Sequence, residues 1–156
     1  MRVVLQNDWI SERAMLAVKN KDVDSLNFII QNQIPGELHS YKSVDSVTDE
    51  TEATNYPTEF LNSLDVPGTP PHNLQLKVGS TIIMLRNLNH PKLCNGTRLS
   101  VKKLMNNLIL AKIIKGKFKG EEVLIPRIPI IPANLPFQFK RIQFAVGLAF
   151  AMTINK

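Results

Sequence analysis

Two hydrophobic periods divide the chain. Residues 13–18 form an apolar run of buried-strand length, and apolar residues then recur at helical spacing, at Val23, Leu26, Ile30 and Ile34. Asn20 or Asp22 is expected to cap this helix, because each offers a side-chain oxygen to a free first-turn N–H, and Pro35 is expected to end it. The pattern predicts a strand, a loop and a helix, the beginning of an α/β unit.

Residues 37–73 are acidic and rich in turn-forming residues. Within them, Glu59, Phe60 and Leu64 predict one or two helical turns over residues 57–64. The run of proline and glycine at residues 67–71 marks a boundary.

Beyond that boundary the period becomes that of strands. Five short runs are separated by tight turns, at residues 74–78, 81–85, 99–105, 108–114 and 121–125. Five short strands predict a small closed or half-closed β-barrel, because closure protects the edges of so short a sheet. Residues 137–144 alternate as a further strand, and the chain ends in another apolar segment.

Composition indicates a globular protein, with 156 residues, 44% hydrophobic and 21% charged. Cys94 is the only cysteine, so an internal disulfide is excluded and a reducing compartment is expected. No signal-peptide core or apolar stretch of bilayer length is present, so we expect an intracellular protein without a membrane partner.

Charge is distributed unevenly. Residues 1–78 carry 6 Lys/Arg and 11 Asp/Glu, a net −5, whereas residues 79–156 carry 13 Lys/Arg and 2 Glu, a net +11. A basic half of this kind favours a polyanionic partner, and nucleic acid before membrane.

Three lysines alternate in the stretch Lys115, Lys117 and Lys119. On an extended hairpin they would lie on one side and meet successive phosphates. The alternative is a solvated turn whose lysines discourage pairing between sheet edges.

Two other places carry a functional and a structural interpretation. Asn95-Gly96 is a strong hairpin-turn signal, so the turn is either architectural or also presents Arg98 to a phosphate. Lys19 and Asn20 precede a helix start, where free N–H groups favour an anion, but Asn20 also serves as a helix cap.

The sequence gives little support for metal binding, base stacking or another class of enzyme. The three histidines and Cys94 lack the paired spacing of a zinc site, so no metal is expected. Trp9, Phe137 and Phe139 could stack on bases, although packing is the alternative. No Ser-His-Asp, Cys-His or metal constellation indicates another class of enzyme.

Several stretches together resemble the C-terminal part of a petite-integration-frequency DNA helicase, especially the kind found in Helitron transposons. In chain order, they are residues 11–24, 56–62, 85–88 with 94–98, 125–128 and 151–156. The resemblance implies α/β plus β architecture, in which a partial second RecA-like domain carries an inserted Src-homology-3-like five-stranded β-barrel. It divides the chain into residues 1–36 of the motor domain, a connection at 37–73, the barrel at 74–130, and a truncated return to the motor domain at 131–156.

The resemblance also implies a function, that of a fragment of an ATP-dependent DNA helicase. Single-stranded DNA is the implied partner, together with the missing remainder of the helicase. DNA repair, recombination and telomere maintenance are the processes implied, with a nuclear location in a eukaryote. By resemblance, the DNA-facing residues include Arg86, Thr153, Asn155 and Lys156, the last three in a motor motif that the chain's end interrupts.

ATP and magnesium are implied for the full-length family, but the chain lacks the residues that would hold them. A phosphate-binding loop needs a glycine, four residues, then Gly-Lys-Ser/Thr, so that backbone N–H groups surround the phosphates. Gly116-Lys117 is the only Gly-Lys pair, and Phe118 follows it. We therefore expect no cofactor and no ATP hydrolysis by this chain alone. The alternative function is a non-enzymatic protein-interaction module derived from a transposon helicase.

Overall fold

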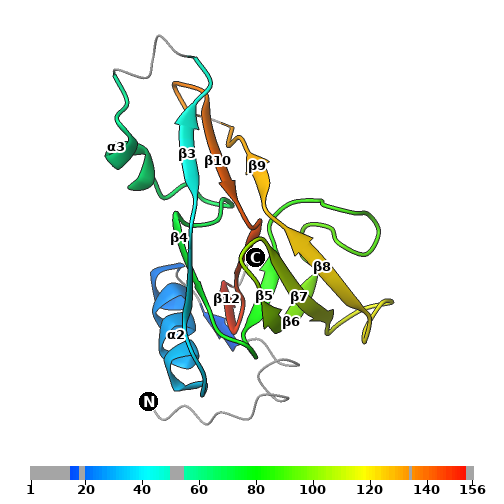
Figure 1. Cartoon of the computed structure of the whole chain (residues 1–156). Helices are drawn as coiled ribbons and strands as arrows, with labels where there is room; N and C mark the ends of the chain where they lie inside the picture. The colour runs from blue at the N-terminus through cyan, green and yellow to red at the C-terminus, as the bar shows by residue number, and fades with distance from the viewer. Residues whose placement is uncertain (1–14, 18–19, 50–54, 134, 154–156) are drawn as a thin grey trace.

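The computed structural model describes residues 15–17, 20–49, 55–133 and 135–153, and Figure 1 labels most of its helices and strands. The helices are α2 (Asn20–Gln33) and α3 (Thr58–Asn62). The strands before residue 105 are β1 (Met15–Ala17), β2 (His39–Lys42), β3 (Val44–Val47), β4 (Asn73–Leu76), β5 (Thr81–Met84) and β6 (Arg98–Leu104). Those after it are β7 (Leu108–Ile113), β8 (Glu122–Pro126), β9 (Ile128–Ile130), β10 (Phe139–Gln143), β11 (Val146–Leu148) and β12 (Ala151–Thr153).

Helix α2 packs beside a two-stranded parallel sheet formed by β1 and β12, the first and last described strands. The predicted helix is confirmed, and it ends before Pro35 as expected. Asn27 ties the helix to β12, because its Oδ1 accepts from the Ala151 N–H at 2.7 Å and its Nδ2 donates to the Ala151 carbonyl at 3.2 Å. The first and last described segments thus form one α/β unit; its assignment as RecA-like stays a prediction.

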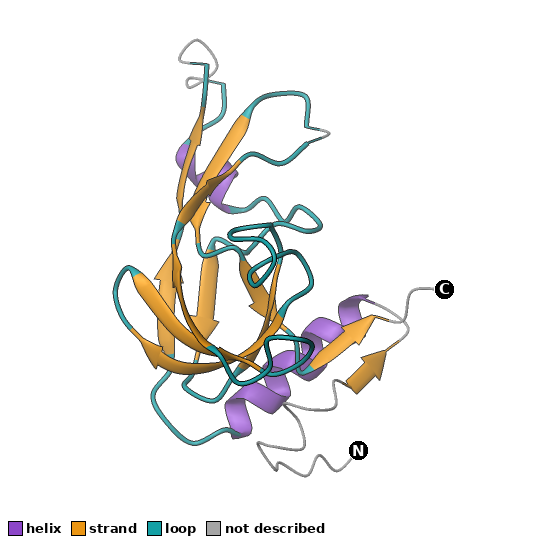
Figure 2. Ribbon diagram, turned by 90° about the vertical axis from the view of Figure 1, so that its right-hand side faces the viewer, coloured by secondary structure: helices purple, strands orange, loops and turns teal. Residues whose placement is uncertain are grey.

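A five-stranded antiparallel sheet forms the second part, in the order β11-β5-β6-β7-β8, and its strands curve strongly in Figure 2. Four of the five predicted strands are in it. A closed barrel is not confirmed, because no pairing joins the edge strands β11 and β8 within the described residues.

The prediction was wrong for residues 74–78, which do not belong to this sheet. Strand β4 pairs instead with β2, in a two-stranded antiparallel sheet where Tyr41 lies opposite Leu74. The turn after β4 explains the difference. The buried Ser80 hydroxyl accepts from the Lys77 N–H at 3.1 Å and donates to Gln31 Oε1 at 3.0 Å, which holds this corner against α2. The place beside β5 is taken by β11.

A third sheet, β3-β10-β9, projects from the body as an arm (Figure 1). The alternating pattern of residues 137–144 correctly predicted β10. Strands β2 and β3 were missed, because they are four residues each and their partners lie far along the chain. The short helix α3 was predicted, but Leu61 is its buried residue, whereas Phe60 is 42% exposed.

The main hydrophobic core lies inside the curved sheet. It combines residues of the five strands, such as Ile82, Val101 and Ile109, with Tyr41 and Leu74 from the β2–β4 pair. Phe144 packs edge-on against Tyr41, with ring centroids 5.0 Å apart. The β2–β4 pair therefore covers the core although its strands are not part of the larger sheet.

A buried ion pair fixes the arm to the rest of the fold. Arg141 on β10 lies directly opposite Asp45 on β3, and its side chain is fully buried. Its Nε and Nη2 donate to the two carboxylate oxygens of Asp45 at 2.9 and 3.0 Å. The guanidinium also donates to the carbonyls of Leu61, Leu64 and Pro70 at 3.0 to 3.2 Å. One side chain thus joins two strands, helix α3 and the following loop.

Replacing Arg141 with methionine should destabilise the protein by about 3–5 kcal/mol, because Asp45 would stay buried without its charge partner. Urea unfolding followed by circular dichroism measures the loss. Lys140→Met is the matched control, since Lys140 is half-buried on the same strand and points away from Asp45. Equal stability of the two variants would contradict a structural role for the pair.

Candidate nucleic-acid interface

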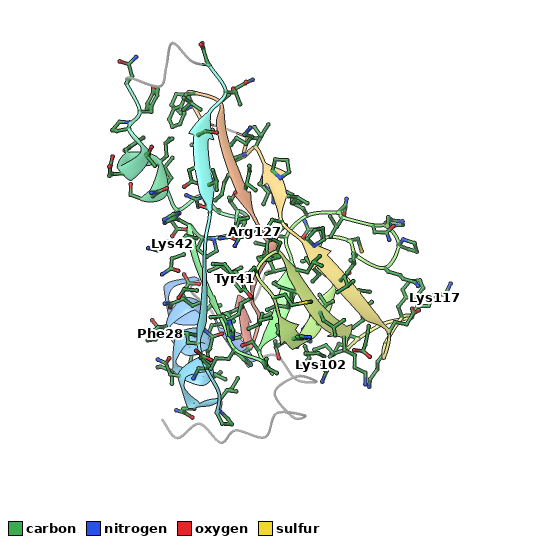
Figure 3. All side chains as sticks on the ribbon, in the orientation of Figure 1. Phe28, Tyr41, Lys42, Lys102, Lys117 and Arg127 are labelled. Carbon is green, nitrogen blue, oxygen red and sulfur yellow. The ribbon has the colours of Figure 1, made fainter. Side chains whose placement is uncertain are left out.

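The three alternating lysines lie at the tip of the β7–β8 hairpin, and Figure 3 shows Lys117 at its outer end. Lys115, Lys117 and Lys119 are all exposed. Their predicted extended geometry was wrong: residues 115–120 form a bend and a turn, closed by hydrogen bonds from the Lys119 N–H to the Gly116 carbonyl and from the Gly120 N–H to the Ile113 carbonyl. The lysines are therefore presented around a turn rather than along one side of a strand.

The turn is packed against a neighbouring loop. Phe118 lies beneath two ammonium groups, with Lys92 Nζ at 5.7 Å and Lys117 Nζ at 5.8 Å from its ring centroid. Lys92 also forms an ion pair with Glu121 at 3.0 Å. Cation–π contacts at an exposed site stabilise by about 0.5–1 kcal/mol, so they help to order the tip without removing its charge.

The sequence reasoning missed further exposed lysines on the strands of this sheet. The register of β6 against β7 shifts between Val101 and Lys103, so a bulge leaves Lys102 and Lys103 both exposed. Lys112 is exposed on β7, opposite Ser100. The consecutive lysines in a strand of otherwise buried residues were the available signal, because two neighbours face solvent together only where alternation is interrupted.

Two predicted arginines are engaged within the fold. Arg98 is only 8% exposed, and burial lowers the pKa of its guanidinium. Arg86 is half-buried and donates to the carbonyls of Gly68 and Leu85. In this conformation Arg86 stabilises the loop at Gly68, and the Arg98 side chain is largely withdrawn from solvent.

The turn at Asn95-Gly96 supports the architectural interpretation. Gly96 has a φ of 99°, its N–H donates to the Met84 carbonyl at 2.9 Å, and the Asn95 N–H donates to Asn87 Oδ1 at 2.8 Å. The Thr97 N–H closes the turn onto the Cys94 carbonyl.

The remaining predicted contacts fall near the chain ends. Lys19, Asn155 and Lys156 lie outside the described residues. Asn20 is the first residue of α2, and Thr153 pairs with Ala17, just before that helix. Of the predicted contacts at the two ends, the structure therefore describes only Asn20 and Thr153, in and beside the paired strands and helix of the α/β unit.

The three aromatic residues predicted to stack on bases differ in their surroundings. Trp9 lies outside the described residues, and Phe139 is fully buried, with the Arg141 guanidinium carbon 5.0 Å from its ring centroid. Phe137 is half-buried and stacks on Tyr56, with centroids 4.0 Å apart. Base stacking by Phe139 is therefore contradicted in this conformation.

The geometry offers no place for a nucleotide's phosphates at the Gly-Lys pair. Gly116-Lys117 lies in a turn between two strands, whereas a phosphate loop precedes a helix whose N–H groups receive the anion. Within the described residues, no group of three His, Cys, Asp or Glu side chains could hold a metal ion. In the same part of the chain, no helix is long and apolar enough to span a membrane.

Comparison with known proteins identifies the fold. Residues 59–104 match the family model for the 2B domain of DNA helicase Pif1. This confirms the resemblance to petite-integration-frequency helicases. No curated protein sequence matches the chain.

Solved structures of Pif1 helicases share the fold over most of the chain. Unliganded Pif1 from Bacteroides sp is 20% identical with a TM-score of 0.66, covering 92% of this chain and 42% of that one. Pif1 from Candida albicans is 20% identical with a TM-score of 0.65, covering 92% and 38%. A Bacteroides Pif1 bound to single-stranded DNA is 19% identical with a TM-score of 0.62, covering 90% and 31%. The chain thus spans less than half the length of these helicases.

The architectural role of the Asn95-Gly96 turn predicts that Gly96→Ala lowers stability by roughly 1–3 kcal/mol, because a side chain disfavours a positive φ. Gly147→Ala is the matched control: its φ is not positive, and an added Cβ would meet only Leu85 side-chain carbons, at ordinary contact distances of 3.8 and 4.0 Å. Thermal unfolding of both variants measures the difference. A Gly96→Ala protein as stable as the control would leave the turn without its structural role.

Proposed function

We propose that this chain is part of a Pif1-type DNA helicase and binds single-stranded DNA by charge, without hydrolysing ATP alone. The observation that carries the proposal is the set of exposed lysines on β6, on β7 and in the turn between β7 and β8. The fold that presents them is shared with a Pif1 bound to single-stranded DNA. The family match at residues 59–104 covers the segment that leads into this basic surface and includes its first two lysines, Lys102 and Lys103.

The binding would be electrostatic and independent of base sequence. Lysine ammonium groups neutralise phosphates and release the counterions condensed on the strand, so affinity falls as salt rises. Lys115, Lys117 and Lys119 would supply the contacts at the hairpin tip, and the exposed Lys102 and Lys103 would extend the surface along β6.

A second group of contacts is proposed on the resemblance alone. Lys19, Asn20, Thr153, Asn155 and Lys156 lie in the sequence in or beside β1, α2 and β12, and β1 pairs with β12. In this arrangement the single-stranded DNA would be held at the α/β unit. Arg86 and Arg98 would stabilise the loops between this unit and the lysine-rich hairpin.

ATP and magnesium would be held by parts of the helicase outside this chain. This assignment follows from the absence of a phosphate-binding sequence and from the position of Gly116-Lys117 in a turn between strands. The remainder of the helicase is therefore a proposed partner. An intracellular site of action, nuclear in a eukaryote, accords with DNA as the substrate.

The proposal predicts a steep salt dependence. If about five phosphates are neutralised, affinity for labelled single-stranded DNA should fall roughly a hundredfold between about 50 and about 200 mM salt. Changing Lys115, Lys117 and Lys119 to glutamine should reduce the slope of log affinity against log salt by about 2. Fluorescence anisotropy with two unrelated base sequences measures both effects.

The control changes Lys42 and Lys140 to glutamine and is compared with a variant that changes only Lys115 and Lys117, so that each loses two charges. If both double variants lose affinity equally, net charge rather than the hairpin tip is responsible. A salt-independent affinity, or none, would refute electrostatic DNA binding and leave the protein-interaction alternative. An ATPase assay completes the test, since turnover by the purified chain would contradict the proposed division of activities.

A further inference from the structure

A groove runs between helix α2 and the segment from Asn62 to Gln75, with a volume of about 760 Å³. Its walls are completed by Leu85 and by Gly147-Leu148. It lies on the opposite side of the body from the lysine-bearing hairpin, as the positions of Phe28 and Lys117 in Figure 3 show. None of the proposed DNA contacts at the hairpin tip lines it.

The floor of the groove is held by buried amide side chains. Asn27 is bonded to β12 through Ala151, and Gln31 Nε2 donates to the Gln75 carbonyl at 2.9 Å. Both residues are at most 4% exposed. Because the Gln31 bond joins helix α2 to the opposite wall and Asn27 fixes the helix to β12, the groove is part of the packed fold.

One turn of helix α2 supplies both an acidic and an apolar group to the groove. Asp24 and Phe28 are four residues apart, so they lie on the same face of the helix. Phe28 is 55% exposed, although a phenyl ring is among the most favourable side chains to bury. The face is therefore suited to a ligand that combines an apolar with a polar group.

The charge of the groove opposes that of the protein. The chain has a net charge of +6, yet the charged residues lining the groove are Asp24 and Asp65, with no lysine or arginine among the lining residues that the structure describes. Burial and the repulsion of Asp65 raise the pKa of Asp24. A cation between the two carboxylates would relieve this repulsion, whereas a phosphate would add to it.

One polar atom of the wall also lacks a partner. Thr69 is 8% exposed and lines the groove, and its Oγ1 has no hydrogen-bond partner. Buried hydroxyls are normally satisfied, so the unpaired Thr69 hydroxyl is a hydrogen-bonding group of the wall that the fold itself does not use.

We propose that this groove binds a basic segment of another polypeptide, with a lysine or arginine between Asp24 and Asp65 and an apolar side chain on Phe28. The other wall, at Val66 and Leu148, would enclose the aliphatic part of the basic side chain. This site is separate from the proposed DNA surface and opposite to it in charge. It would let the chain bind a basic protein segment and DNA at the same time.

The test uses the whole chain and a fluorescein-labelled peptide that contains alternating lysine and leucine, with a glutamate-for-lysine counterpart as probe control. The lysine peptide should bind, and the glutamate peptide should not. Asp24→Asn with Asp65→Asn should weaken binding by about tenfold, since each partly exposed ion pair contributes modestly. Phe28→Ala should weaken it by several-fold.

The matched control is Glu37→Gln with Glu59→Gln, two exposed carboxylates outside both the groove and the lysine-bearing hairpin. It loses the same charge and should retain the affinity of the unaltered chain. Equal weakening by the two double variants would overturn the proposal, as would no binding of the lysine peptide. Amide resonances of α2 and residues 62–75 should shift on binding, and shifts confined to other surfaces would also overturn it.

The DNA-binding and peptide-binding proposals can be tested independently of each other. The Lys115, Lys117 and Lys119 variant should lose DNA affinity and keep peptide affinity, whereas the Asp24 and Asp65 variant should bind DNA as tightly as its charge-matched control. Loss of both activities in the Asp24 and Asp65 variant, relative to that control, would mean that the groove is not an independent site.

Discussion

The buried pair of Arg141 and Asp45 is the contact on which the rest of the architecture depends. It joins strands that are 96 residues apart along the chain, and the guanidinium also organises helix α3 and the loop after it through three carbonyls. An arginine is suited to this task, because its planar fork can bond a carboxylate with two donors and still reach further acceptors. The same loop forms one wall of the acidic groove, so the ion pair supports a surface that it does not itself reach.

The sequence was a good guide where structure is local. The helical spacing of apolar residues and the position of Pro35 predicted helix α2. Short apolar runs separated by turn residues predicted strands β5 to β8. It was a poor guide where partners are distant. Nothing local in the segment around Asp45 indicates that it pairs with the strand of Arg141, and the pairing of β4 with β2 depends on the corner at Ser80.

The same distinction applies to the site residues. Charge composition drew attention to the second half of the chain, where the lysines of the β7–β8 turn are exposed. Burial could not be read for Arg98, because an arginine in a strand is compatible with either face of the sheet. The consecutive lysines at 102 and 103 were a local signal of interrupted alternation, but the position of the bulge follows only from the register of two strands.

The hydrogen bonds that hold the β4–β5 corner against helix α2 affect how force would pass through the protein. Lys77 Nζ donates to the Ile34 carbonyl at 2.9 Å, and Ser80 bonds Gln31, so the corner is fastened to helix α2 at two points. A sheet attached to the helix at a single point could rotate about that point when force is applied, whereas two attachment points prevent this rotation. Tension applied at the outer hairpin would therefore be carried through the strands to helix α2 and to the paired strands β1 and β12 beside it.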